Sequence, residues 1–185
     1  MKITSPALLP GFIRRIAWNI KYVLFDYGFT SAPRSTIDYL CSNLPEDASI
    51  LELGCGGGAL LRGLRESGCK CHYCGVDISK RALALAQSYG DQRTALIQSD
   101  IESFCSPFRW NAILLIESIY YLDIHRMPEL FSRLETMLDD CGFILVRVHD
   151  VERHHAHMEA LRRIAPNGEM VDPTLFRVVK SATEP

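Results

Sequence analysis

The 185-residue sequence lacks an excess of positive charge. Its 20 Lys and Arg residues are matched by 22 Asp and Glu residues, which gives a formal net charge of −2. Affinity for nucleic acid depends mainly on Lys and Arg side chains that neutralise phosphates, so a nucleic-acid substrate is not favoured. Hydrophobic residues make up 48% of the chain, which is enough for a globular core. A chain of this length builds one domain rather than two.

The sequence also lacks a hydrophobic run long enough for a signal peptide or a membrane span. The apolar stretch from Ala7 to Leu9 is interrupted at once by Pro10, Gly11 and two arginines. The seven cysteines are an odd number and lie mostly inside apolar runs, which is typical of reduced thiols. We therefore expect a cytoplasmic protein without a membrane span.

One segment is rich in metal-binding residue types but lacks the spacing of a zinc site. Residues 68–77 contain three cysteines and a histidine, whereas no second Cys-x-x-Cys pair occurs elsewhere. If residues 72–76 form a strand, Cys71 and Cys74 point to opposite faces of the sheet. We expect buried thiols here and no metal centre. A metal shared by His154 and His157, one helical turn apart, is the weaker alternative to exposed histidines.

Apolar segments alternate with helical patterns from residue 35 onward. The predicted strands cover residues 49–53, 72–76, 94–98, 111–116, 143–148 and 175–180. The predicted helices cover residues 35–43, 59–66, 80–89, 128–138 and 151–164. Continuous apolar strands joined by helices predict an α/β fold of the Rossmann-like, doubly wound type, with a mostly parallel sheet and helices on both faces. Ligands of such sheets bind at the carboxyl ends of the strands.

An amphipathic helix is predicted before the sheet. Apolar residues recur at steps of three and four from Phe12 to Tyr27, and residues 31–33 break the pattern. We predict that residues 1–34 form a helical lid and residues 35–185 a single ligand-binding domain. Aromatic residues of the lid are Trp18, Tyr22, Phe25 and Tyr27. Ordinary packing on the sheet and adsorption to a membrane surface are the alternatives.

A glycine-rich turn follows the first strand and opens a helix. Gly54, Gly56 and Ala59 fit the dinucleotide-binding pattern, so an NAD-binding protein remains an alternative. The full string from Leu51 to Ala59, with Glu52 two residues before Gly54, resembles the first motif of class I S-adenosylmethionine-dependent methyltransferases. The resemblance extends over residues 35–150 and implies that residues 35–185 are a methyltransferase domain that binds S-adenosylmethionine.

Two later segments strengthen this resemblance. Residues 75–79 look like the second motif of the family, whose acid, here Asp77, binds the ribose hydroxyls of the cofactor. Residues 99–101 resemble the third motif, in which Asp100 accepts the adenine amino group and the backbone of Ile101 lies beside the ring. The resemblance implies that the cofactor is bound by Glu52, Gly54, Cys55, Gly56, Gly58, Asp77, Ile78, Asp100, Ile101 and Glu117.

The segment after the fourth strand points to the methyl acceptor. Residues 117–122 are similar to those of NodS-like N-methyltransferases, which act on small molecules such as aminosugars. The signatures of the base-modifying and the metal-dependent catechol-type methyltransferases are absent. We predict methyl transfer to an N or O atom of a small molecule. His149 or Glu117 would remove the acceptor proton, and Tyr120 would shape the pocket.

Two features remain open in the sequence. The family sheet ends in two strands that form an antiparallel hairpin, whereas only residues 175–180 are recognisable after the last helix, so we expect six strands or a shortened chain. A non-catalytic cofactor-binding subunit that activates a partner is the second functional hypothesis, and a homodimer is also left open.

Overall fold

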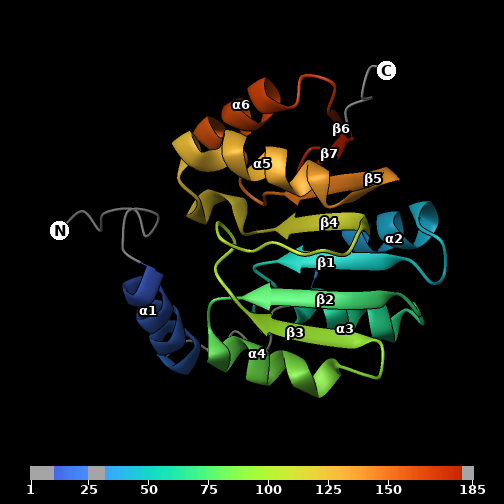
Figure 1. The fold of residues 1–185 in the computed structure, drawn as a ribbon, viewed down its shortest axis with the longest axis vertical. Helices are drawn as coiled ribbons and strands as arrows, with labels where there is room; N and C mark the ends of the chain where they lie inside the picture. Colours follow the sequence, from blue (N-terminus) through green and yellow to red (C-terminus); the bar gives the residue numbers. More distant parts are fainter. Residues whose placement is uncertain (1–10, 25–31, 181–185) are drawn as a thin grey trace.

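The computed structural model describes residues 11–24 and 32–180. Within these residues, one sheet has seven strands in the order β3-β2-β1-β4-β5-β7-β6 (Figure 1). The strands are β1 (Ser49–Leu53), β2 (His72–Asp77), β3 (Thr94–Gln98), β4 (Trp110–Ile116), β5 (Leu138–Arg147), β6 (Glu169–Asp172) and β7 (Leu175–Val179). The helices are α1 (Gly11–Leu24), α2 (Arg34–Asn43), α3 (Ala59–Glu66), α4 (Lys80–Ala86), α5 (Met127–Thr136) and α6 (His155–Ile164).

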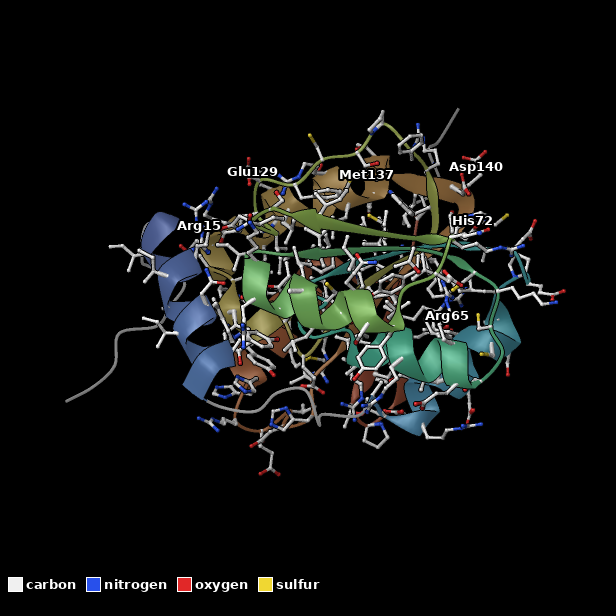
Figure 2. All side chains as sticks on the ribbon, turned by 90° about the horizontal axis from the view of Figure 1, so that it is seen from below. Arg15, Arg65, His72, Glu129, Met137 and Asp140 are labelled. Atoms are coloured by element: carbon white, nitrogen blue, oxygen red, sulfur yellow. The ribbon has the colours of Figure 1, made fainter. Side chains whose placement is uncertain are left out.

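Strands β1 to β5 are parallel, and β7 pairs antiparallel with both β5 and β6. The predicted doubly wound, mostly parallel sheet is therefore confirmed. The carboxyl ends of β1 to β4 point toward α1, which lies beyond that edge of the sheet (Figure 1). In Figure 2, Arg15 of α1 lies at one end of the molecule, and Arg65 and His72 lie toward the other.

The expectation of a six-stranded or shortened sheet is wrong. Strand β6 is present and forms the outer edge beside β7. Its four residues are exposed or half-buried and contain no continuous apolar run. A strand that is buried on neither face gives no hydrophobic signal, which explains why the pattern missed it.

Other boundaries also differ from the predicted ones. Helix α6 begins at His155 rather than at residue 151, because residues 151–154 form turns. Strand β5 begins five residues early, at Leu138, with an irregular register against β4. Helix α1 is described from Gly11 to Leu24; Phe25 and Tyr27 lie outside the described residues, as do residues 1–10 of the predicted lid.

Two hydrophobic cores cover the two faces of the sheet. One core packs alternate residues of the central strands against α5 and α6, and the other packs the intervening residues against α2, α3 and α4. Cys74 belongs to the first core and Cys71 to the second, which confirms that these thiols point to opposite faces. No helix within residues 11–24 and 32–180 has the length and hydrophobicity needed to span a bilayer.

Candidate functional site

A cavity of about 300 Å³ lies at the carboxyl ends of the central strands. Its walls come from the glycine turn, from the segments that follow β2, β3 and β4, and from α1. Among the residues that line it are Arg14, Trp18, Tyr22, Glu52, Gly54, Cys55, Gly56, Gly57, Asp77, Ile78, Asp100, Ile101, Glu117, Ser118, Tyr120 and Tyr121. Most of the predicted cofactor residues thus share one cavity, which lies where the doubly wound fold binds its ligands.

The glycine turn requires glycine for two different reasons. Gly54 has a φ of 83°, and a Cβ there would lie 2.7 Å from the Cβ of Ser118. Gly58 has a φ of 80°, and its Cβ would meet Ala86 of α4 at 2.8 Å. Gly54 therefore keeps the cavity floor open, whereas Gly58 lets α3 pack on α4. Gly58 is not among the residues that line the cavity, and its contact with the cofactor stays a prediction.

Asp77 is held by backbone donors from two segments. The Gly56 N–H donates to Oδ2 at 2.9 Å, and the Ser79 N–H donates to Oδ1 at 2.8 Å. Burial raises the pKa of the Asp77 carboxyl, while these two hydrogen bonds act against that increase. Ser79 also caps α4 by accepting the Ala82 N–H. The carboxylate is thus fixed at the junction of the glycine turn and α4.

Glu52 is the most deeply buried acid of the site, with 3% of its surface exposed. The Tyr73 hydroxyl donates a hydrogen bond to its carboxylate. Burial raises the pKa of Glu52 to about 7, and the Tyr73 bond opposes the shift. Because the group also lines the cavity, a bound cation would favour its ionised form.

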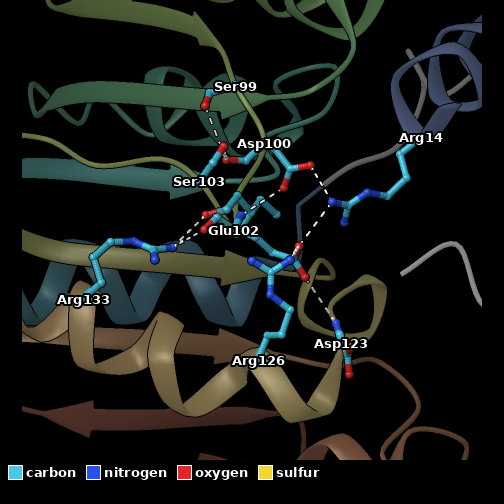
Figure 3. Close-up of polar contacts among 9 residues, drawn as sticks. Arg14, Ser99, Asp100, Glu102, Ser103, Asp123, Arg126 and Arg133 are labelled. Carbon is cyan, nitrogen blue, oxygen red and sulfur yellow. Dashed lines mark hydrogen bonds and ion pairs between the residues drawn. The ribbon is translucent and has the colours of Figure 1, made fainter. Parts of the chain in front are cut away.

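Asp100 forms an ion pair that the sequence did not indicate. Its Oδ1 accepts the Glu102 N–H at 3.0 Å, and its Oδ2 lies 2.8 Å from Arg14 Nη2 (Figure 3). Arg14 belongs to α1, 86 residues earlier in the chain, and no motif marks it among the polar residues of that helix. Sequence reasoning therefore missed Arg14 as a residue of the site.

Helix α1 is connected to three strand ends. Besides the Arg14 contact with the segment after β3, Asn19 Oδ1 accepts the Ser79 hydroxyl at 2.8 Å, after β2. The Trp18 ring meets the Tyr121 ring edge-on at 4.8 Å, after β4. These contacts place α1 across the cavity as one of its walls.

The three predicted catalytic residues lie together. Glu117 Oε2 lies 2.7 Å from His149 Nδ1 and accepts the His149 backbone N–H at 3.0 Å. It also accepts a hydrogen bond from the Tyr120 hydroxyl at 3.2 Å. Oε1 of Glu117 pairs with Arg147 at the end of β5. Glu117 has a φ of 55°, the one positive value for a non-glycine residue among those described. Such strain persists where the surroundings fix a functional side chain.

His149 lies beside the cavity rather than in its lining, and its side chain is 55% exposed. Burial raises the pKa of Tyr120, whose ring stacks on His154 with centroids 4.1 Å apart. His157 Nε2 lies 3.2 Å from the Leu122 carbonyl. No three His, Cys, Asp or Glu side chains within the described ranges are arranged to hold a metal ion.

The family described as "Methyltransferase domain" matches residues 25–177. No curated protein sequence matches the chain. The magnesium protoporphyrin IX methyltransferase ChlM from Synechocystis PCC 6803, with bound SAM, has a similar structure: 16% identity, a TM-score of 0.70, and coverage of 96% of this chain and 100% of that one. The N-methyltransferase NodS from Bradyrhizobium japonicum WM9, in complex with S-adenosyl-L-homocysteine, aligns at 18% identity with a TM-score of 0.68, over 90% and 98% of the two chains.

A third similar structure is larger than this chain. Coclaurine N-methyltransferase, bound to N-methylheliamine and SAH, has 18% identity and a TM-score of 0.55. The match covers 61% of this chain, which spans about a third (34%) of that enzyme.

The fold and the site define a class I methyltransferase, with the seven-stranded sheet and the acids at the ends of its strands. The chain belongs to the methyltransferase-domain family, since the match covers most of its length. The predicted class, S-adenosylmethionine-dependent methyltransferase, is thereby confirmed.

Proposed function

We propose that the chain transfers the methyl group of S-adenosylmethionine to an N or O atom of a small molecule in this cavity. One observation carries the proposal: acids from three consecutive strands line the same cavity as the glycine turn. Glu52 lies in β1, Asp77 ends β2, and Asp100 follows β3. A cationic cofactor fits this acidic wall, since opposite charges stabilise each other most where water is excluded.

Each acid has a role that suits its position. The Asp77 carboxylate can accept both hydroxyl protons of a ribose, because Gly56 and Ser79 fix its orientation and lone pairs remain on both oxygens. Asp100 and Ile101 would receive the adenine ring, and Glu52 would face the positively charged end of the cofactor. Gly54 and Gly56 allow the backbone to approach the ligand. Gly58 contributes by packing rather than by contact.

We propose that His149 is the base that removes the proton from the methyl acceptor. When bound, the cofactor supplies an electrophilic methyl group on a sulfonium sulfur, so the chain has to align a lone pair and remove a proton. The Glu117 carboxylate would accept a hydrogen bond from His149 Nδ1–H, which leaves the lone pair on Nε2 available to act as the base. Arg147, Tyr120 and His149 already share the Glu117 oxygens. Glu117 is therefore better suited to orient His149 than to act as the base itself.

Tyr120 has a supporting role in this proposal. Its raised pKa keeps the hydroxyl neutral, so it donates to Glu117 and does not serve as a base. Its ring, with those of Tyr121 and Trp18, forms an aromatic wall over the acceptor side. Such a wall excludes water. Through Trp18 it also brings α1 into contact with the segment after β4. We propose on this basis that residues 1–34 contain a lid over the domain of residues 35–185.

The acceptor class is supported by the chemistry of the site and by the names of similar proteins. NodS and coclaurine N-methyltransferase are named as N-methyltransferases, and ChlM is named for magnesium protoporphyrin IX. A histidine base and a nearby carboxylate suit an amine or a hydroxyl. The proposal therefore covers both target atoms, with aminosugars as the first amines to try.

The proposal is tested with S-adenosylmethionine that carries an isotopically labelled methyl group. The protein is incubated with a panel of aminosugars, other amines and hydroxy compounds, and products are identified by mass spectrometry. We expect label on an N or O atom of a panel member, and its loss in His149→Ala. Cofactor binding without transfer to any panel member would contradict the proposal and favour the non-catalytic subunit. His72→Ala, at the far end of β2, is the matched control.

A further inference from the structure

Arg14 of α1 contacts two acids of the segment after β3. Its Nη2 lies 2.8 Å from Asp100 Oδ2 and 3.2 Å from Glu102 Oε2 (Figure 3). The side chain of Arg14 is 13% exposed, that of Glu102 7% and that of Asp100 19%. Ion pairs removed from water in this way are costly to break on one side, because the remaining charge stays poorly solvated. An exposed pair would have little effect.

The segment that carries the two acids is anchored independently of α1. Arg133 of α5 donates to the Glu102 carbonyl at 2.6 Å, and Arg126 lies 2.8 Å from Glu102 Oε2 (Figure 3). Both arginines come from the sheet domain rather than from the N-terminal helix. The Arg14 contacts are therefore the part of this network that joins α1 to the sheet domain.

Helix α1 forms one wall of the cavity, through Arg14, Trp18 and Tyr22. Movement of α1 away from the strand ends would therefore open the cavity on this side. Asn19 accepts hydrogen bonds from two neutral donors, the Ser79 hydroxyl and the Arg81 backbone N–H, whereas the Arg14 contacts involve three charges. Charged hydrogen bonds are about twice as strong as neutral ones. Arg14 should therefore dominate the polar attachment of α1.

We propose that Arg14 is a positioning residue that latches α1 over the cofactor. It fixes the Asp100 carboxylate for the adenine amino group, and it has to release Asp100 and Glu102 each time α1 opens for exchange of cofactor and product. This inference rests on the proposed function, since it places S-adenosylmethionine in the cavity. It adds a residue from outside the glycine turn and the acidic motifs to the cofactor site.

The geometry at Asp100 agrees with a contact that persists when adenine binds. Each carboxylate oxygen can accept about two hydrogen bonds. Oδ1 holds the Glu102 N–H and Oδ2 holds Arg14, which leaves room for the adenine amino group on either oxygen. A single nitrogen, Nη2, contacts Asp100 and Glu102 together, so the ammonium group of a lysine keeps the charge but sits on a shorter side chain.

The test measures release of S-adenosylhomocysteine by stopped-flow fluorescence, using Trp18 or a displacing ligand as the signal. We expect Arg14→Gln to release the product roughly tenfold faster or more, since affinity changes appear mainly in dissociation rates. The release rate of Arg14→Lys should lie between those of Arg14→Gln and the wild type. Arg15→Gln removes the same charge from the exposed side of the same helix and should stay within about twofold of the wild type.

Hydrogen exchange of the free protein gives a readout without ligand. Arg14→Gln should reduce protection in residues 11–24 and leave β1 and β4 unchanged. Unchanged product release in Arg14→Gln would overturn the latch, as would an equal acceleration in Arg15→Gln. Equal acceleration in Arg126→Gln, which shares Glu102 but not α1, would also overturn it. If the wild type binds no S-adenosylhomocysteine, the proposed function itself fails; binding with unaltered release defeats the latch alone.

Discussion

The two sides of the cavity are built in different ways. On the side of β1 to β3, the key acid Asp77 is held by backbone N–H groups of Gly56 and Ser79. On the side of β4 and β5, Glu117 is held largely by side chains, those of Arg147, His149 and Tyr120. Backbone donors remain when side chains change, whereas side-chain networks depend on every member. In the proposed function, the side that binds the cofactor can thus stay constant while the side that binds the acceptor changes with the substrate.

The largest expected effect is a loss of stability at Gly54, which is compared with Gly68, a glycine of similar backbone conformation. Gly54→Ala should destabilise the protein by about 3 kcal/mol, because a positive φ of 83° is combined with a contact of 2.7 Å to Ser118. Gly68→Ala has a φ of 77° but no atom within 4 Å of the new Cβ, so about 1 kcal/mol is expected. Urea denaturation measures both. Equal losses would show that the cavity floor does not constrain Gly54.

The next prediction tests whether the two sides of the cavity have different functions. His149→Ala should lower kcat by roughly a hundredfold or more if His149 is the base. Affinity for S-adenosylmethionine should remain nearly unchanged, since His149 is absent from the cavity lining. Steady-state kinetics and calorimetry give the two quantities. A normal kcat, or a parallel loss of cofactor affinity, would contradict the division between the two sides.

A smaller effect is expected at Arg147. Arg147→Gln removes the partner of Glu117 Oε1 and leaves His149 in place, so kcat should fall about tenfold through poorer orientation of the base. The pH–rate profile should shift as well, because the Glu117 charge next to His149 is no longer neutralised. A purely structural role would lower stability without moving the profile. Arg177→Gln, in the β6–β7 hairpin, is the control.

An effect of similar size concerns Glu52 on the cofactor side. Its pKa of about 7 means that the free protein binds a proton there near neutral pH. A cationic ligand favours the ionised form, so cofactor affinity should rise about tenfold from pH 6 to pH 8, with proton release on binding. Calorimetry in buffers of different ionisation enthalpy measures that release. Glu52→Gln should abolish the pH dependence; an unaltered profile in this variant would assign it to another group.

The same raised pKa has the opposite effect on the free protein. A carboxyl whose folded pKa exceeds its unfolded value contributes stability that is fully present below about pH 4.5 and is lost as the pH rises through about 7. The free protein should therefore lose stability over the range in which the complex gains affinity. Thermal melts with and without ligand at pH 6 and pH 8 would compare the two trends.

The sequence predicted well that the residues of the proposed cofactor side lie together, because their signals are local. The glycine turn, Asp77 and Asp100 each follow an apolar strand, so the fold class and the order of strands place them at one edge. Arg14 could not be found in this way, since its partner lies 86 residues away and arginines are ordinary on the polar face of a helix. Its role follows only from where α1 packs.

The grouping of residues on the proposed acceptor side was predicted in part. Glu117, Tyr120 and His149 were chosen because they follow β4 and β5, and the structure brings them together. Their connection through Arg147 was missed, although a charged residue at the end of an apolar strand is a usable signal. Strand β6 was missed because its residues are exposed or half-buried. A strand without a buried face lacks the alternation of hydrophobic and polar residues from which a strand is predicted.

The most direct test of the central claim is a calorimetric titration of the purified protein with S-adenosylmethionine, S-adenosylhomocysteine and NAD, repeated with Asp77→Ala. We expect micromolar binding of both sulfur ligands, a loss of roughly a hundredfold in Asp77→Ala from the missing ribose contacts, and no binding of NAD. Asp140→Ala, which replaces an exposed acid, should leave the affinity for both sulfur ligands unchanged. Binding of NAD in place of the sulfur ligands, or sulfur-ligand binding that is indifferent to Asp77, would contradict the account.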